Sequence, residues 1–461
     1  RIPRLKIVIL GAGQVGSSVA ESLVSEANDI TVVDIDATRL RNLQDRLDLR
    51  TVLGSAAHPS VLVEAGIEDC DMMIAVTQSD ETNLVACKLA QQLFNVPTRI
   101  VRLRATDYLS NERVLGPDCF AVDLAICPEQ ILTDYIVKLI EFPEALQVLE
   151  FAHGKVSLVA VRAFQGGPLV GHPLKDLRKH IPSVDTRIAA IFRGDSPILP
   201  EGDTVVQAGD EVFFLAATED IRQVMHEVRR MDQPVRRVMI AGGGNIGLRL
   251  ARAIERDYAI KIIEYDKRRC EMLSTRLDRA LVLQGDVTDE GLLEAENVSD
   301  MDLFVAVTND DENNIMSCLL AKRMGARRVV ALINRRSYVD LLQAGQIDIA
   351  ISPAQATIGT LLAHVRRGHV TRVHSLRRGV AEALEAVVHG DRDSCRSVGR
   401  RIEEIDLPKG AAIAAIVRGD KVIMAHHDTV VLAEDHLIVF VTDKKLLPKV
   451  EKLFEVSVGF V

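Results

Sequence analysis

The 461-residue chain contains no tryptophan, and aromatic residues make up only 4% of it. It also lacks long apolar runs: segments such as 212–217 and 411–417 are far shorter than the roughly 20 residues that span a bilayer. The formal net charge is −9, so basic residues are not in excess. These absences argue against direct membrane insertion and against binding of nucleic acid, which requires a basic surface.

Metal-binding and redox motifs are missing as well. The seven cysteines are an odd number without a C-x-x-C pair, and the twelve histidines form no H-E-x-x-H pattern. Such spacing argues against zinc sites and disulfide frameworks. No signal-peptide pattern precedes the first apolar run. We therefore expect a cytosolic protein with reduced thiols and no metal site.

What the chain does contain is a glycine-rich pattern typical of dinucleotide-binding domains. Residues 6–34 read KIVILGAGQVGSSVAESLVSEANDITVVD, which predicts strand, turn, helix and strand in that order. Gly11 permits the tight turn, Gly13 lets the backbone approach a pyrophosphate, and Gly16 lets the helix pack against the strand. Helix N–H groups favour phosphates. Asp34 ends the second strand, where a carboxylate can accept hydrogen bonds from ribose hydroxyls.

The same pattern recurs in the second half of the chain. Residues 237–264 read RVMIAGGGNIGLRLARAIERDYAIKIIE, with Gly242, Gly244 and Gly247 at the same spacing and Glu264 as the acid. One match is weak evidence, because a closely packed structural turn has the same glycines. Two matches in full context favour two nucleotide-binding domains.

The repetition extends beyond the glycines and predicts the fold class. AVTQSDETN at 75–83 matches AVTNDDENN at 306–314, and IAAIFRGD at 188–195 matches IAAIVRGD at 413–420. Alternating strands and helices after each glycine motif predict an α/β fold with two Rossmann-like, doubly wound parallel sheets. The short strands with Arg-Gly-Asp turns predict a small α+β module after each sheet. We place the four domains at 1–141, 142–231, 232–368 and 369–461.

This tandem arrangement resembles the regulatory proteins of bacterial Trk potassium-uptake systems, the TrkA family. The likeness rests on GAGQVG, VVDID and AVTQSDETN in the first half, on ICP at 126–128 and ISP at 351–353, and on the two AAIxRGD segments. It covers essentially the whole chain. It implies two N-terminal and two C-terminal domains of the RCK type (regulator of potassium conductance). It also implies a homotetrameric gating ring, peripheral on the cytosolic face of the membrane through a TrkH-like potassium-translocating partner.

The resemblance further implies the ligands and the residues that hold them. NAD or NADH, with ATP or ADP as alternatives, would control ion flow. Our own hypothesis is that a nucleotide at the first sheet repositions the helix predicted near 129–140 and thereby moves the sheet against its module. In each domain the glycine loop would hold phosphates, the acid would hold the ribose, and the threonine and its neighbour would line the adenosine side. Arg102 would add charge near the phosphates. The implied site residues are Gly11, Ala12, Gly13, Gln14, Val15, Gly16, Asp34, Thr77, Gln78 and Arg102, then Gly242, Gly243, Gly244, Asn245, Ile246, Glu264, Thr308 and Asn309.

The two halves differ at one position that bears on the ligand. When RIVRL at 99–103 is aligned with RVVAL at 328–332, Arg102 corresponds to Ala331. A phosphate there would lack a guanidinium partner. We therefore expect the second site to prefer a different nucleotide, to bind weakly or to be empty. Arg335 or Arg336 could partly substitute.

Two alternatives compete with a gating-ring subunit. A NAD-dependent oxidoreductase shares the glycine fingerprint, but neither sheet is followed by a segment that offers an acid–base pair or a Cys–His set. The modules are also short and alike, which is a poor basis for a substrate cleft. We therefore expect no enzymatic activity and no catalytic residue. A nucleotide sensor that works without a channel is the second alternative.

Overall fold

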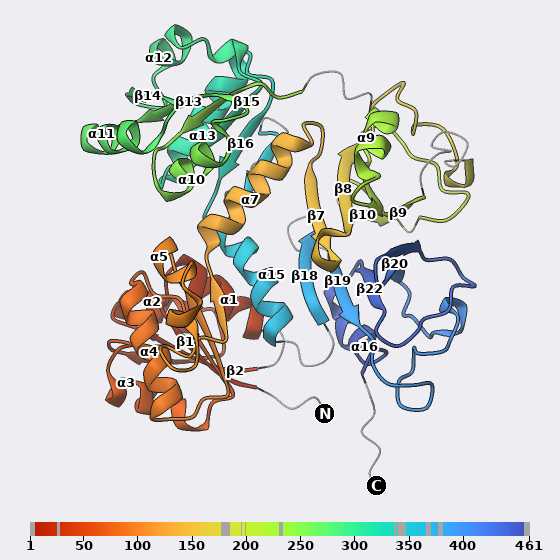
Figure 1. Cartoon of the computed structure of the whole chain (residues 1–461), viewed down its shortest axis with the longest axis horizontal. Coiled ribbons are helices and arrows are strands. Elements are labelled where there is room, and N and C mark those ends of the chain that lie inside the picture. Colours follow the sequence, from red (N-terminus) through yellow and green to blue (C-terminus); the bar gives the residue numbers. More distant parts are fainter. Residues whose placement is uncertain are drawn as a thin grey trace.

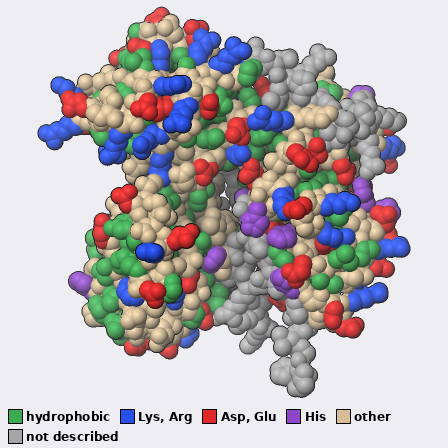
Figure 2. All heavy atoms as spheres, viewed as in Figure 1, with side chains coloured by type: hydrophobic (Ala, Val, Ile, Leu, Met, Phe, Trp, Pro, Cys, Tyr) green, Lys and Arg blue, Asp and Glu red, His purple; other side chains and the backbone are tan. Residues whose placement is uncertain are grey.

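Four sheets in two alternating types make up the described part of the chain (Figure 1). The structure is a computed structural model. It describes residues 5–24, 28–176, 185–194, 196–198, 200–229, 234–335, 338, 347–365, 370–376 and 381–455. Figure 2 shows acidic and basic side chains mixed over the face in view.

The first parallel sheet has six strands in the order β3-β2-β1-β4-β5-β6. Chain order reverses between β1 and β4, which is the switch point where ligands of such sheets bind. The strands are β1 Lys6–Leu10, β2 Asp29–Asp34, β3 Arg50–Leu53, β4 Met72–Ala75, β5 Thr98–Arg102 and β6 Leu124–Ile126. The helices are α1 Gln14–Val24, α2 Ala37–Gln44, α3 Pro59–Glu64, α4 Asp80–Gln92, α5 Thr106–Leu109, α6 Glu112–Leu115 and α7 Pro128–Glu141.

The second parallel sheet repeats this topology in the order β14-β13-β12-β15-β16-β17. Its strands are β12 Arg237–Ala241, β13 Ala259–Glu264, β14 Leu281–Gln284, β15 Leu303–Ala306, β16 Val329–Leu332 and β17 Ile349–Ile351. Its helices are α10 Asn245–Ile254, α11 Lys267–Arg276, α12 Glu290–Ala295, α13 Asp311–Arg323 and α15 Pro353–Val365. The predicted pair of Rossmann-like sheets is therefore confirmed.

The strand register corrects one alignment made from the sequence. The side-chain amide of Asn83 donates to the backbone oxygen of Arg102, and that of Asn314 donates to the backbone oxygen of Leu332. The counterpart of Arg102 is therefore Leu332, and the alignment with Ala331 was wrong by one residue. The span from Asn314 to Leu332 is 18 positions, one fewer than the 19 from Asn83 to Arg102, which motif similarity does not reveal.

Each parallel sheet is followed by a five-stranded antiparallel sheet. The first has the order β10-β9-β11-β8-β7 and the second β18-β19-β22-β20-β21, which is the same topology read from the other edge. The strands of the first are β7 Gln147–Phe151, β8 Val156–Arg162, β9 Thr186–Arg193, β10 Ser196–Ile198 and β11 Glu211–Ala217, with helix α9 at Ile221–Arg229. Those of the second are β18 Val370–Leu376, β19 Ala381–Val387, β20 Ala411–Arg418, β21 Lys421–Met424 and β22 His436–Val441, with helix α16 at Leu447–Glu451.

The two antiparallel sheets pack face to face. One cluster of buried side chains joins them, and small residues such as Ala190 and Ala415 allow close approach. The rings of Phe213 and Phe440 meet across the contact at 6.3 Å between centroids. Arg187 of β9 also donates to backbone oxygens of Ile413 and Ala425 in the second module, and burial lowers the pKa of its guanidinium. The modules therefore form one continuous core.

The last helix of each parallel unit crosses over to pack on the other unit, and the two helices meet near their first turns (Figure 1). α7 packs against α10, so Leu132 and Ile136 belong to the core of the second sheet. α15 packs against α1, so Leu361 belongs to the core of the first sheet. Arg328 of the second unit also donates to backbone oxygens of Pro143 and Ala145, just beyond α7. Each half therefore supplies part of the hydrophobic core of the other.

The seven cysteines all lie in the described residues and are free thiols, with only Cys119 exposed. Burial, reinforced by the charge of Asp71, raises the pKa of the Cys70 thiol to about 12. Of the helices in the described residues, none combines the length and apolar composition that crossing a bilayer requires.

The arginine of each repeated Arg-Gly-Asp segment forms an ion pair within its module. Arg193 donates from Nε and Nη2 to the two carboxylate oxygens of Asp210 at 3.0 and 2.9 Å. Arg418 binds Asp435 in the same way, at 2.8 Å for both contacts. Burial alone would raise the pKa of the Asp210 carboxyl, but hydrogen bonds from Arg193 and a backbone N–H outweigh it and lower the pKa. The arginine of each turn therefore ties two strands together.

Asp210→Asn should lower the free energy of unfolding by about 1–3 kcal/mol, because it breaks a charge-assisted pair whose arginine is still partly solvated. Since the folded-state pKa of Asp210 is depressed below its usual 3.8, its contribution is present above that pH and lost as pH falls through the folded value. Urea unfolding at pH 7 and near pH 3 measures both effects. Asp203→Asn, at an exposed pair with Lys175, is the control and should change little. A loss independent of pH would contradict this account.

Candidate nucleotide-binding site

Both glycine loops have a geometry that only glycine allows at two positions. The backbone φ is +109° at Gly11 and +110° at Gly242, a region that L side chains rarely adopt. A Cβ atom added to Gly16 would lie 1.8 Å from the backbone oxygen of Gly11, and one added to Gly247 would lie 1.9 Å from that of Gly242. The turn and the close helix–strand contact inferred from the spacing are therefore both present, in each half.

The middle glycine of each motif faces open space instead. A Cβ atom at Gly13 would have only Arg39 Nη1 near it, at 4.0 Å, and one at Gly244 only Arg269 Nη1, at 3.6 Å. The backbone here is accessible to a ligand, and a guanidinium stands beside it. Sequence reasoning missed both arginines, although each follows its acid by five residues, an offset that the two halves share.

The acid at the end of the second strand fastens the glycine loop. Asp34 Oδ2 accepts from the backbone N–H of Ala12 at 2.6 Å, and Oδ1 accepts from the N–H two residues after Asp34 at 2.8 Å. Glu264 makes the same pair of contacts, with Gly243 N–H at 2.8 Å and the N–H two residues after it at 2.9 Å. Each carboxylate oxygen keeps a second lone pair. The acids can therefore hold the loop and accept from a ribose together.

The threonines predicted to line the adenosine side are tied to a buried asparagine. The Thr77 hydroxyl and backbone N–H both donate to Asn83 Oδ1, at 2.7 and 3.0 Å. Thr308 makes the same two contacts with Asn314, at 2.7 and 2.9 Å. The hydroxyls thus hold the ends of β4 and β15 in shape. Sequence reasoning missed the asparagines, although the six-residue offset occurs in both repeats.

One cavity of about 1670 Å³ joins the two loops. It lies where the N-terminal turns of four helices meet, because α1, α10, α7 and α15 all contribute to its wall. Gly16 and Gly243 are the predicted residues that do not line it. The predicted residues in its wall are Gly11, Ala12, Gly13, Gln14, Val15, Asp34, Thr77, Gln78, Arg102, Gly242, Gly244, Asn245, Ile246, Glu264, Thr308 and Asn309.

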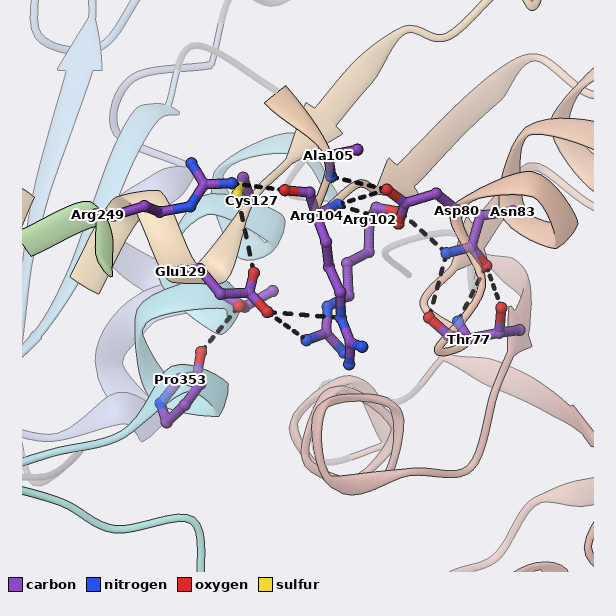
Figure 3. Close-up of polar contacts among 11 residues, drawn as sticks. Thr77, Asp80, Asn83, Arg102, Arg104, Ala105, Cys127, Glu129, Arg249 and Pro353 are labelled. Carbon is purple, nitrogen blue, oxygen red and sulfur yellow. Dashed lines mark hydrogen bonds and ion pairs between the residues drawn. The ribbon is translucent and has the colours of Figure 1, made fainter. Parts of the chain in front are cut away.

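Arg102 is held by a residue that sequence reasoning did not select (Figure 3). Its Nη2 atom lies 3.0 Å from Oε1 of Glu129, which belongs to the first turn of α7. Arg104 Nε lies 3.5 Å from the same oxygen. Arg249 of α10 reaches across from the second half, donating to Gln130 Oε1 at 2.9 Å and to the backbone oxygen of Arg104 at 2.5 Å. We call the parts of the cavity beside the first and second glycine loops the first and second pockets. Arg249 thus connects the first pocket to α10, the helix that follows the second glycine loop.

The second pocket has no such charges at the matching places. Leu332 stands where the first pocket has Arg102, and Ala354, directly after the proline that begins α15, stands where α7 has Glu129. Both lie in the wall of the cavity. The departure expected from the sequence therefore holds, although the residue concerned is different.

Arg335, one of the two suggested substitutes, does line the cavity. Its guanidinium lies 2.9 Å from Glu312 Oε1, so it already has an anionic partner. The other, Arg336, lies outside the described residues. Within the described residues, no group of three His, Cys, Asp or Glu side chains is placed to hold a metal ion.

The fold, repeated in tandem with its paired glycine loops, is that of solved RCK domains. The crystal structure of the GsuK RCK domain superposes with a TM-score of 0.62 at 17% identity, covering 98% of this chain and 95% of that one. The GsuK channel bound to NAD gives a TM-score of 0.61 at 18% identity, over 98% of this chain and 79% of that one. At such identity the likeness concerns the fold.

Sequence comparison identifies the family. The family model of the TrkA-N domain matches residues 7–128 and 238–353, and that of the TrkA-C domain matches 158–229 and 392–454. The Trk system potassium uptake protein TrkA of Halomonas elongata is 58% identical over 99% of this chain and 100% of its own length. The protein of that name from Vibrio alginolyticus is 54% identical over the same shares. The chain belongs to the TrkA family of Trk potassium-uptake systems, as the resemblance implied.

The glycine geometry predicts a sharp contrast between neighbouring substitutions. Gly16→Ala should lower the free energy of unfolding by about 1–3 kcal/mol, because its Cβ must displace the Gly11 carbonyl. Gly13→Ala is the matched control and should stay within about 0.5 kcal/mol of the parent, since its Cβ enters open space. Thermal unfolding of both variants measures the difference. Equal losses would contradict the packing described for Gly16.

Proposed function

We propose that this chain is the nucleotide-sensing regulatory subunit of a Trk-type potassium uptake system. The observation that supports this role is the single cavity lined by both glycine loops and by the crossing helices α7 and α15. A ligand there contacts both halves of the chain at once. It can therefore favour one arrangement of the halves over another, which is what a regulator needs.

The ligand that suits each pocket is an adenine nucleotide. The loop N–H groups and the nearby Arg39 or Arg269 suit phosphates, and the acid suits a ribose. Beside the acids, Ile35 and Tyr265 are 77% and 75% exposed, and both face the cavity, where an adenine ring can cover them. NAD(H) and ATP or ADP all carry these groups. The GsuK channel, which shares the fold, has been solved bound to NAD and bound to ADP.

A binding role fits the cavity better than catalysis by a NAD-dependent oxidoreductase. The described residues of its wall include neither histidine nor cysteine. Several of its carboxylates are engaged within the protein: Asp34 and Glu264 hold their loops, and Glu129 pairs with two arginines. Asp266 accepts from the backbone N–H of Arg269, and Asp286 accepts from Thr288. No side chain there is arranged as an acid–base pair among these residues. The wall can bind the phosphates and ribose of a nucleotide, but its described residues offer no acid–base pair to catalyse a reaction on them.

The rest of the proposal concerns assembly. The chain forms a homotetrameric ring that docks on a TrkH-like membrane subunit at the cytosolic face of the membrane. Four domains, at 1–141, 142–231, 232–368 and 369–461, would be its building blocks. Membership of the TrkA family supports this assembly, and the continuous core shared by the two modules supports a ring unit that moves as a whole.

Asp34→Ala should weaken binding of NADH and ATP alike at the first pocket, by roughly ten- to hundredfold, because hydrogen bonds to a charged group are lost. Glu264→Ala should do the same at the second pocket, where that pocket binds. Isothermal titration of the full chain resolves the two by affinity and stoichiometry. Asp48→Ala, an exposed carboxylate outside the cavity, is the control. Unchanged affinity in both cavity variants would refute the assigned sites.

The assembly can be tested separately from the ligand. Light scattering of the purified chain should give the mass of four copies. Co-expression with a TrkH-like subunit should yield a complex that survives affinity purification, and potassium uptake by cells lacking their own regulator should be restored. A monomer that restores no uptake would refute the gating-ring role while leaving nucleotide binding intact.

A further inference from the structure

The wall of the first pocket carries more positive charge than its own carboxylate neutralises. Arg102 and Arg104 share one oxygen of Glu129, at 3.0 and 3.5 Å. The Arg102 and Glu129 side chains are each only 11% exposed, so water screens this cluster poorly. The Nε atom of Arg102 is buried without a hydrogen-bond partner, and that of Arg104, also buried, makes the 3.5 Å ion pair with Glu129 but no hydrogen bond. Two guanidinium groups and one carboxylate leave this cluster with a net charge of +1.

The backbone adds to the attraction for an anion. First-turn residues of α1, α7, α10 and α15 all line the cavity, and the N-terminal end of a helix carries partial positive charge. Glu129 lies in the first turn of α7. It therefore holds the position, beside two arginines and a helix end, that an anionic ligand would favour.

The second pocket supplies a comparison within the same chain. Leu332 and Ala354 replace Arg102 and Glu129 together, so the arginine and its carboxylate are both absent. Shared backbone hydrogen bonds to the first aspartate of α4 and of α13 align Arg104 with the neutral Asn334. Joint replacement is expected if the carboxylate serves to neutralise the arginines, because an unpaired buried charge is costly.

We propose that Glu129 is an internal substitute for a ligand phosphate, and that a nucleotide with a terminal phosphate displaces it from Arg102 and Arg104. This rests on the proposed nucleotide-binding function. A terminal phosphate presents three oxygens to the two arginines, whereas Glu129 presents one. The pyrophosphate of a dinucleotide is internal and has no terminal group to offer. The first pocket thus discriminates ATP from NADH at this point, and the second pocket does not.

Displacement of Glu129 would alter contacts with the other half of the chain. The next residue, Gln130, accepts a hydrogen bond from Arg249 of α10, the glycine-loop helix of the second pocket. Arg249 also binds the backbone of Arg104. A change at the start of α7 therefore reaches the second loop through direct contacts, without any rearrangement of the sheets.

The test uses the full chain with the second pocket closed by Gly244→Glu, whose side chain enters open space and repels phosphates. ATP and NADH are titrated by calorimetry without divalent cations. Glu129→Gln should tighten ATP binding about tenfold and leave NADH within about twofold. Arg102→Leu should weaken ATP roughly ten- to hundredfold with little effect on NADH. Combining Arg102→Leu, Arg104→Asn and Glu129→Ala, which copies the second pocket at all three positions, should abolish the discrimination and leave no charge at these positions.

Several outcomes would overturn the proposal. Weaker ATP binding by Glu129→Gln would show that the carboxylate does not compete with phosphate. If Glu129→Gln weakened ATP binding only when magnesium is added, Glu129 would be assigned to a bound cation instead. Equal losses of affinity for ATP and NADH in the Arg102→Leu variant would show that Arg102 does not discriminate between them. If the parent chain binds neither nucleotide, the proposed function itself fails, whereas binding of both without separation by these variants refutes only this inference.

Discussion

The packing of each half's last helix against the other half's glycine-loop helix is the contact on which the rest of the structure depends. α7 packs on α10 and joins the buried cluster that contains Val238 and Ile240 of the second sheet, and α15 packs on α1 and joins the cluster that contains Ile7 and Ile9 of the first. Because burial of apolar surface drives folding, each sheet has a complete core only when the other half is in place. The same exchange brings four helix ends and both glycine loops to one cavity.

Local features of this fold could be predicted from the sequence, and register could not. The roles of Gly11 and Gly16 follow from spacing, because a turn and a helix start are short-range events. The counterpart of Arg102 was wrong by one residue because RIVRL and RVVAL look alike. The pairing of strands decides which residues correspond, and the one-residue difference in the span from the asparagine to the strand end shifts that correspondence without changing the motif.

The shared cavity lay beyond the reach of the sequence for a different reason. Glu129 is 27 positions from Arg102, and Arg249 is 145 from Arg104, yet they meet because the helices cross. Periodicity predicts that α7 has an apolar face, but it does not say what covers that face. Asn83 and Asn314 could have been found from the sequence. The two repeats place each asparagine six residues after its threonine, and comparing them would have indicated the hydrogen bond between the two.

The crossing of α7 and α15 also bears on how such a chain could originate. A polypeptide with one sheet and one module would carry a last helix with no sheet of its own to cover. Two copies could satisfy each other as a symmetric swapped dimer. Fusion of the copies would turn an association that depends on concentration into an intramolecular one. Fusion would also allow the two copies to differ in sequence. The difference between Arg102 and Leu332 is such an asymmetry, which no homodimer could encode.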